Sequence, residues 1–274
     1  MSEVYPSHPI ETPVVRTSLE QIICRDAGHA VRIQDVIELL QGRGMRVFVV
    51  GGACRDWLTG EPVKDVDLSL DRPVKEAHAI LRQAFPGMDP VLRRNERFGT
   101  LSWGDAALGG VDLNILRSHH DIQNDDMWTT SFVAREDLRE DALTRDFSMN
   151  AFYYPCHEEG RLWDPLGCGV EDLRGRVLRL ITHPRVLSTS YRTTFRIIQF
   201  LCRGYVPAPN IHEHLERFAD HDIQGMGDRL LNWLPNHLGK DPALWREFRQ
   251  RLSAFARQDA SRQVLDRVFA HQEG

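Results

Sequence analysis

Asp65, Asp67 and Asp112 are the residues of this chain whose type and spacing are best suited to chemistry. Apolar and polar residues alternate over 63–70, which predicts a strand with Asp65 and Asp67 on one face. Asp112 lies between two apolar residues in a second predicted strand, 110–116. Neighbouring carboxylates repel each other and are costly to bury unpaired, so they require a cation or solvent.

A hard divalent cation such as Mg²⁺ meets this requirement because it takes oxygen ligands. Three acids from two neighbouring strands would hold two ions about 4 Å apart, which is the arrangement used for in-line phosphoryl transfer. We therefore expect two Mg²⁺ ions at Asp65, Asp67 and Asp112. The alternative is that all three are solvated acids on an exposed sheet face.

A pair of glycines precedes these acids. Gly51 and Gly52 follow the β-rich run 46–50 and open a predicted helix, 53–59, with Arg55 in its first turn. Glycine allows backbone N–H groups to approach a phosphate closely, and a helix N-terminus favours anions. In isolation the pair would indicate an ordinary turn, but next to the acids it predicts a phosphate cradle beside a metal site.

The elements that must position these residues indicate an α/β domain followed by helices. Residues 1–30 contain three prolines and little periodicity, so we expect a loose N-terminal arm. Helices and strands alternate over 31–155, ending in a predicted helix over 135–151. Residues 156–274 are expected to form a helical region, helical throughout from Pro184 onward and short at its C-terminal end.

Charge is divided unevenly along the chain, which has a net charge of −5 overall. Residues 173–274 carry 16 Lys and Arg against 10 Asp and Glu, whereas residues 1–172 carry 18 against 29. The acidic N-terminal part suggests metal ions as partners, and the basic C-terminal part suggests phosphates. No apolar run is long enough to span a membrane. The five scattered cysteines indicate reduced thiols and a cytoplasmic location.

Four ordered motifs in this chain resemble those of the bacterial tRNA nucleotidyltransferase and poly(A) polymerase family. They are Gly51–Leu58 with Lys64–Asp67, Phe98–Thr100 ahead of the Asp112 strand that ends in Arg117, Glu140–Ala151, and Asp164–Gly167 with Asp172–Leu173. The resemblance implies a nucleotidyltransferase head with a polymerase-beta-like mixed sheet, followed by an all-α neck and a short helical tail. It also implies an enzyme that adds a nucleotide from a nucleoside triphosphate to a hydroxyl acceptor without a template, with an RNA 3′ end as the expected acceptor and pyrophosphate as the product.

The resemblance also assigns roles to residues. Asp65 and Asp67 would bind both metal ions, and Asp112 would complete the site of the ion that activates the attacking hydroxyl. The residues implied for the nucleotide are Gly51, Gly52 and Arg55 at the triphosphate, and Arg145, Asp146 and Asn150 at the sugar.

The chain departs from the family on the first neck helix, where members carry acids that read the incoming base. No Asp or Glu occurs over 173–212, whereas seven arginines do. Four of these, Arg185, Arg192, Arg196 and Arg203, are spaced to lie along one line of a helix opened by Pro184. We expect Arg192 and Arg196 to contact the nucleotide, the alternative being a solvated basic face. Base selectivity should be weaker than, or different from, that of a CCA-adding enzyme.

Two further possibilities stay open at this point. The acceptor is a small molecule or a protein in one, and the chain is a non-catalytic RNA- or nucleotide-binding relative in the other. His119 and His120, in a polar segment after the Asp112 strand, are possible metal or substrate contacts or simply part of a loop.

Overall fold

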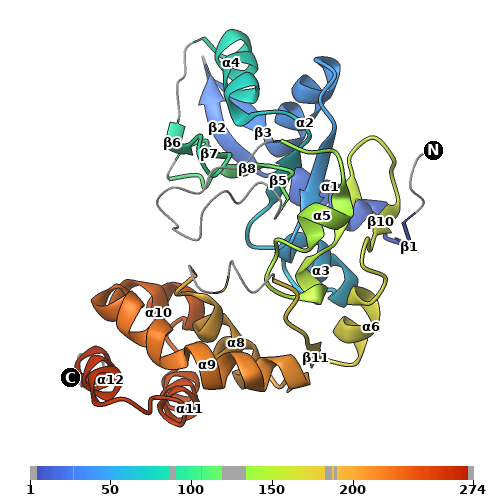
Figure 1. The fold of residues 1–274 in the computed structure, drawn as a ribbon. Coiled ribbons are helices and arrows are strands. Elements are labelled where there is room, and N and C mark those ends of the chain that lie inside the picture. Colours follow the sequence, from blue (N-terminus) through green and yellow to red (C-terminus); the bar gives the residue numbers. More distant parts are fainter. Residues whose placement is uncertain are drawn as a thin grey trace. The chain divides into compact units, whose positions relative to one another are not determined.

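A computed structural model describes residues 5–26, 28–86, 91–105, 107–118, 134–182, 187 and 190–270. Its contacts divide the chain into two compact units, residues 1–170 and 171–274 (Figure 1). Over the described ranges, no helix combines the length and the apolar character that crossing a membrane requires. The predicted residues His119, His120, Pro184 and Arg185 lie outside the described part of the chain.

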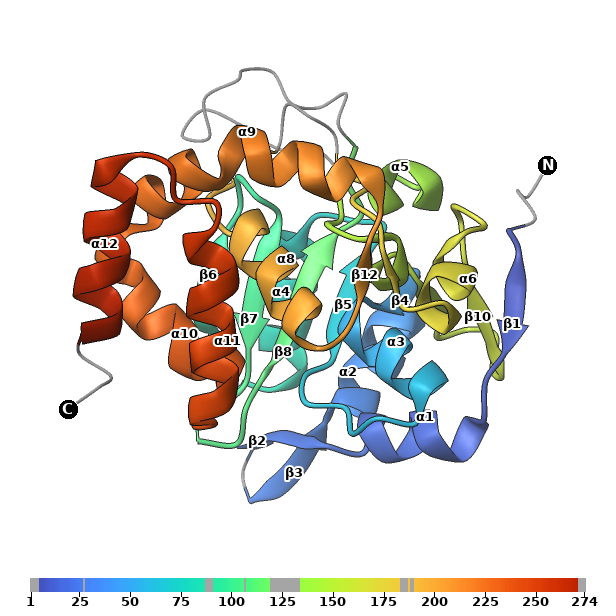
Figure 2. The ribbon, with the colours of Figure 1, turned by 90° about the horizontal axis from the view of Figure 1, so that it is seen from below.

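The first unit is built on an eight-stranded mixed sheet with the order β1-β10-β9-β4-β5-β8-β7-β6. Only the β5–β8 pair is parallel among these neighbours; the other pairs are antiparallel. Figure 2 shows β4, β5, β8 and β7 side by side. The strands are β1 (Ser7–Pro9), β4 (Val47–Val50), β5 (Asp67–Leu70), β6 (Val91–Asn95), β7 (Thr100–Trp103), β8 (Val111–Ile115), β9 (Tyr153–Pro155) and β10 (Arg161–Trp163). The expected mixed-sheet α/β fold is confirmed.

Strand β4 is the buried centre of this sheet. All four of its residues are apolar and buried, as is typical of a strand covered on both faces. Helices α2 (Ile33–Gly42) and α4 (Val74–Ala84) pack against β4, β7 and β8. Each helix buries a stripe spaced by three or four residues, such as Ile33, Ile37 and Leu40. Apolar side chains of α2 and α4 therefore cover one face of the sheet, and exposed polar side chains of the strands are expected on the other face.

Residues 5–26 and 28–30 do not form the loose arm that the prolines suggested. Strand β1 pairs antiparallel with β10, so it belongs to the main sheet. Helix α1 (Thr12–Leu19) follows, with Pro13 in its first turn, where a missing N–H is tolerated. A hairpin of β2 (Ile22–Asp26) and β3 (His29–Arg32) then leads into α2. The partner of β1 lies more than 150 residues away in sequence, which is why local patterns did not show the pairing.

The boundary expected at residue 155 also lies elsewhere. Strands β9 and β10 close one side of the sheet, and the first unit continues to Val170. The remaining short helices near this unit are α3 (Gly52–Thr59), α5 (Leu138–Ala142) and α6 (Gly169–Arg174). The head therefore includes residues at both ends that the sequence placed outside it.

The second unit is helical, as expected, apart from a two-residue parallel pairing of β11 (Val177–Leu178) with β12 (Val206–Pro207). Its core is formed where α8 packs on α9 and α11, and where α9 packs on α12. Phe195 and Phe248 are fully buried there. Its helices are α8 (Thr193–Cys202), α9 (Pro209–Met226), α10 (Leu230–Leu238), α11 (Pro242–Ser253) and α12 (Asp259–Ala270).

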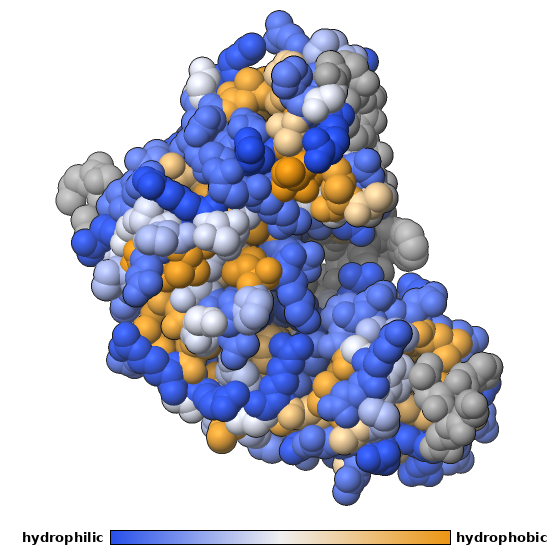
Figure 3. Space-filling model, turned by 180° about the vertical axis from the view of Figure 1, so that it is seen from behind, coloured by the Kyte–Doolittle hydropathy of each residue, from blue (hydrophilic) through white to orange (hydrophobic). Residues whose placement is uncertain are grey.

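Large hydrophobic side chains are seldom exposed among the described residues. Only Val14, Leu108, Leu143 and Val206 are both large and exposed there. On the face drawn in Figure 3, hydrophobic residues form separate patches among hydrophilic ones. A functional site on this surface is therefore expected among its charged groups.

Candidate active site

Four strands place a row of polar side chains across the sheet. Asp67 on β5 lies directly opposite Asp112 on β8, Asp112 opposite Ser102 on β7, and Ser102 opposite Arg93 on β6. Directly opposite residues of neighbouring strands point to the same face. The row therefore brings two of the three predicted acids together, although they are 45 residues apart in sequence.

Asp65 does not join this row. The predicted strand 63–70 begins only at Asp67, because its partner β4 ends at Val50 and turns away at Gly51. Asp65 is exposed. Across the ranges that the structure describes, no three Asp, Glu, His or Cys side chains converge as a metal site would require. The three-carboxylate cluster expected from the sequence is therefore not assembled.

The pair that is assembled nevertheless has a donor set that suits a hard cation. Asp67 is half-buried, and the Asp112 side chain is 45% exposed, so both carboxylates are reachable from solvent. Mg²⁺ is commonly held by one or two carboxylates, with water and substrate phosphates completing its shell. Asp67 and Asp112 fit that requirement, with Asp65 two residues away on the chain.

Gly51 lies against this pair and ends β4. Its φ of 72° is in the left-handed region, where only glycine is unstrained. A Cβ placed here would lie 3.7 Å from Asp67 Oδ2 and 3.8 Å from Arg145 Nη1. Helix α3 starts at the next residue, Gly52, and the first N–H groups of a helix have no partner inside it. The turn thus places helix N–H groups beside a carboxylate and a guanidinium, as the predicted phosphate cradle requires.

Arg55, Asp146 and Asn150 form one hydrogen-bonded network. Arg55 Nη1 donates to Asn150 Oδ1 at 2.7 Å, and Asn150 Nδ2 donates to Asp146 Oδ1 at 3.0 Å. Arg55 also pairs with Asp56 at 2.7 Å, and its side chain is only 15% exposed. Three residues that the sequence assigned to the nucleotide therefore lie together, with part of their hydrogen-bonding capacity used on one another.

The helix predicted over 135–151 is not continuous. Helix α5 covers Leu138–Ala142, and a short 3-10 helix covers Ser148–Asn150. The Asp146 carboxylate accepts from the backbone N–H of Phe147 at 2.8 Å, a local bond that competes with helix formation. The prediction of one helix over 135–151 was therefore wrong, although the Asp146 and Asn150 side chains do meet.

Arg145 belongs to a buried network that the sequence did not reveal. Its Nη2 donates to Asp141 Oδ2 at 2.8 Å and to Ser69 Oγ at 3.2 Å, and its Nε donates to Tyr153 Oη at 3.0 Å. Tyr153 Oη donates to Asp141 Oδ2 at 2.5 Å. Asp141 is 1% exposed, and its other oxygen accepts from the N–H of Arg117 at 2.9 Å.

The charges in this network shift the protonation of its members. Burial raises the pKa of Tyr153 well above its ordinary value, and Asp141 adds to that effect while Arg145 opposes it. Burial by itself lowers the pKa of Arg145, but Tyr153 and Asp141 outweigh it and raise the pKa. Arg145 therefore stays charged and is held in place beside Gly51 and Ser69. The N-cap of α5 is Asp137, whose carboxylate accepts from the N–H groups of Arg139 and Glu140.

In the second unit, the predicted arginine stripe is not carried by one helix. Residues 190–192 lie outside α8, so Arg192 is its N-cap residue, Arg196 lies within it, and Arg203 follows it. All three nevertheless act on one imidazole. The pKa of His237 is lowered first by burial and then by the positive charges of Arg196, Arg192 and Arg203, against the raising effect of the Trp233 carbonyl. The described arginines therefore gather near His237.

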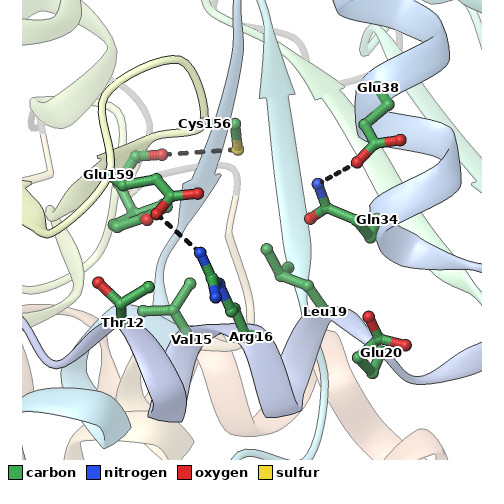
Figure 4. A pocket seen from close by; sticks show the side chains of 10 residues that line it. Thr12, Val15, Arg16, Leu19, Glu20, Gln34, Glu38, Cys156 and Glu159 are labelled. Carbon is green, nitrogen blue, oxygen red and sulfur yellow. Dashed lines mark hydrogen bonds and ion pairs between the residues drawn. The ribbon is translucent and has the colours of Figure 1, made fainter.

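A cavity of about 360 Å³ lies in the first unit between α1, α2 and the β9–β10 connection (Figure 4). Its acids are engaged with neighbours: Glu159 pairs with Arg16 at 3.2 Å, and Glu38 accepts from Gln34 at 2.8 Å. None of the predicted site residues lines it. The cavity is therefore separate from the carboxylate row.

Most of the first unit is similar to known proteins. Residues 47–179 match the family model described as the poly A polymerase head domain. The chain is 31% identical over 150 residues to a CCA-adding enzyme of Anoxybacillus flavithermus, covering 54% of this chain and 34% of that protein. It is 26% identical over 212 residues to poly(A) polymerase I of Escherichia coli, covering 70% and 43%. The chain thus spans less than half the length of these curated relatives.

Solved structures show the same fold. The Thermotoga maritima CCA-adding enzyme complexed with tRNA aligns with a TM-score of 0.60 at 22% identity, covering 80% of this chain and 49% of that one. A tRNA nucleotidyltransferase complexed with a primer tRNA and an incoming ATP analog aligns with a TM-score of 0.59, covering 85% and 62%. The architecture is therefore shared over most of this chain.

Proposed function

Because residues 47–179 match the poly A polymerase head domain model, we propose that the chain transfers a nucleotide from a nucleoside triphosphate to a hydroxyl acceptor without a template. The proposed acceptor is an RNA 3′ end, since similar proteins are CCA-adding enzymes and poly(A) polymerases. The oxygen of the acceptor hydroxyl forms a bond to the α-phosphorus, and the bond from that phosphorus to the leaving oxygen breaks. Pyrophosphate leaves, and the hydroxyl proton passes to solvent.

The observation that carries this proposal is the register of Asp67 opposite Asp112 beside the Gly51 turn. Asp67 and Asp112 are the residues proposed to hold the two Mg²⁺ ions. When bound, the ions would supply charge neutralisation at the triphosphate and lower the pKa of the attacking hydroxyl. The contribution of the protein is to fix oxygen ligands on one rigid sheet face.

The remaining predicted residues act on the nucleotide by binding and orienting it. Gly51 and Gly52 allow the backbone N–H groups at the start of α3 to approach phosphate oxygens. These N–H groups can bind phosphate without a charged side chain. Arg55 is proposed to bind the triphosphate, and its hydrogen bond to Asn150 holds Asn150 and Asp146, which are proposed to bind the sugar. Arg145 is also proposed for the sugar, and its buried hydrogen bonds hold it beside Gly51. Arg192 and Arg196 are proposed as further nucleotide contacts. A cytoplasmic location, as the cysteine usage indicates, is part of the same proposal.

The test measures pyrophosphate release and RNA extension together. The chain is incubated with each labelled nucleoside triphosphate, Mg²⁺ and an RNA that ends in a free 3′-hydroxyl, with the same RNA ending in a 3′-deoxynucleotide as the matched substrate. We expect extension of the first RNA only. Asp67→Asn and Asp112→Asn should each lower the rate about 100-fold or more, because charge stabilisation of the transition state is lost. Glu61→Gln, an exposed acid after α3, serves as the control and should keep its rate.

Other outcomes identify the alternatives. Pyrophosphate release that persists with the 3′-deoxy RNA, and without extension, would indicate a small-molecule or protein acceptor. Binding of nucleotide with no pyrophosphate from any acceptor would indicate a non-catalytic relative. Release that survives both Asp67→Asn and Asp112→Asn would contradict the assigned site.

A further inference from the structure

Asp112 has two side-chain neighbours on the same face of the sheet as Asp67. They come from β7 and β6, which follow β8 in the strand order on the side opposite to β5. Ser102 Oγ on β7 donates a hydrogen bond to Asp112 Oδ1. Arg93 Nη2 on β6 lies 3.9 Å from Asp112 Oδ2. Both follow from the strand register, which sets Arg93, Ser102 and Asp112 in one row. Neither Ser102 nor Arg93 was singled out by the sequence patterns.

The serine hydroxyl has the geometry of a positioning group. An ionised carboxylate offers about four lone-pair sites, so a single hydrogen bond to Oδ1 leaves it able to bind a cation. The bond also restricts rotation of the carboxylate, which otherwise has to be ordered when a cation arrives. Carboxylates that ligate metals typically accept a hydrogen bond from such a neighbouring group. Loss of that hydrogen-bond donor commonly weakens metal binding 10–100-fold.

The arginine acts in the opposite sense. Its guanidinium is permanently charged, so at 3.9 Å from Oδ2 it repels any divalent ion that approaches the same carboxylate. The Arg93 side chain is 68% exposed and the Asp112 side chain 45%, so the pair is held weakly and is easily exchanged. A divalent ion can therefore displace the guanidinium, but it binds less tightly than it would without it.

We propose that Ser102 and Arg93 set the divalent-cation affinity of Asp112 in opposite directions, Ser102 by positioning its carboxylate and Arg93 by competing for it. The inference rests on the proposed function, because it takes Asp112 to be a metal ligand. It assigns the two residues to the control of that site, so that the free carboxylate is occupied by an arginine until a divalent ion replaces it.

The test uses Mn²⁺ alone as the probe, with free Mn²⁺ quantified by electron paramagnetic resonance and Mg²⁺ added as competitor. Ser102→Ala should weaken Mn²⁺ binding about 10-fold or more. Ser102→Thr keeps the hydroxyl and should restore most of the affinity. Arg93→Gln should tighten binding about threefold, and Arg93→Lys, which keeps the charge, should stay near wild type. The Mg²⁺ concentration for half-maximal activity should accordingly rise in Ser102→Ala and fall in Arg93→Gln.

Thr100→Ala is the matched control, because Thr100 lies on the same face of β7 but opposite Asn114 in place of a carboxylate. Its Mn²⁺ affinity should equal that of the wild type. Unchanged affinity in both Ser102→Ala and Arg93→Gln overturns the inference, as does weaker binding in Arg93→Gln. Equal weakening in Ser102→Ala and Ser102→Thr would show a packing effect and also overturns it.

Asp112→Asn separates this inference from the proposed function. If Asp112→Asn leaves Mn²⁺ binding unchanged, then Asp112 is no ligand and the proposed metal site fails, and the inference fails with it. If Asp112→Asn weakens binding but the Ser102 and Arg93 variants do not alter it, only the inference fails.

Discussion

Asp141→Asn should be among the most destabilising single changes in the first unit. The Asp141 carboxylate is 1% exposed and accepts from Arg145 Nη2 at 2.8 Å, Tyr153 Oη at 2.5 Å and the N–H of Arg117 at 2.9 Å. An asparagine keeps the size of the side chain but removes the charge. The Arg145 guanidinium, whose side chain is only 19% exposed, would then face a neutral amide.

The magnitude follows from this geometry. Removing one partner of a buried ion pair costs about 3–5 kcal/mol, because the remaining charge is left uncompensated. For a unit of this size, that cost corresponds to a fall of roughly 6–20 °C in melting temperature. Tyr153→Phe removes the hydroxyl that donates to Asp141 and accepts from Arg145, but it leaves that ion pair in place, so it should cost less, about 1.5–3 kcal/mol.

The assay is urea denaturation followed by circular dichroism, with the melting temperature as a second measure. Asp228→Asn is the control, since Asp228 pairs with Arg267 at 3.2 Å and both side chains are mostly exposed. This surface pair should contribute less than about 1 kcal/mol. A loss below about 1 kcal/mol in Asp141→Asn would refute the reasoning, because the carboxylate would then not be compensating a buried charge.

Three further changes test the site and the core. Gly51→Ala should abolish most activity, because its φ of 72° strains any residue with a Cβ and the strained turn would shift the start of α3 beside Asp67 and Arg145. Gly44, with a φ of 78°, is also in the left-handed region, so Gly44→Ala serves as the control in transfer assays, where equal losses would argue against a local effect. Asp65→Asn should retain more activity than Asp67→Asn in the same assay, because Asp65 stands outside the strand register, and the reverse order would contradict the assignment. Burial raises the pKa of the Cys156 thiol to about 12 from an ordinary value near 9, so the unfolded chain loses this proton first. Its contribution to stability is complete below pH 9 and is lost as the pH rises toward 12; Cys156→Ala should flatten that decline in denaturation curves.

Local sequence patterns predicted most of the elements around the site. The alternation over 110–116 put Asp112 on the polar side of β8, and the apolar run before Gly51 gave the buried strand β4. Helices α2 and α4 lie in the range 31–155, where alternating helices and strands were predicted. These features depend on neighbours in the chain, so composition and periodicity are enough to define them.

Predictions failed where a distant partner overrides the local pattern. The helix expected over 135–151 is interrupted after Ala142, where Asp141 is bonded to Tyr153 and Asp146 accepts from the N–H of Phe147. The arm expected over 1–30 contributes β1, whose hydrogen bonds are made with β10. The Tyr153 bond and the β1–β10 pairing come from tertiary structure and have no trace in a local window.

The sequence by itself determined the chemistry available to this protein: paired carboxylates, a glycine turn and basic groups, together with the motifs that indicate the family. Only the tertiary structure decided which of these groups meet. It set Asp67 opposite Asp112, left Asp65 outside the row, and surrounded Asp112 with Ser102 and Arg93. The physical reason is that alternation along a strand fixes which face a side chain takes, whereas the register between strands is fixed by hydrogen bonding and packing of the whole sheet.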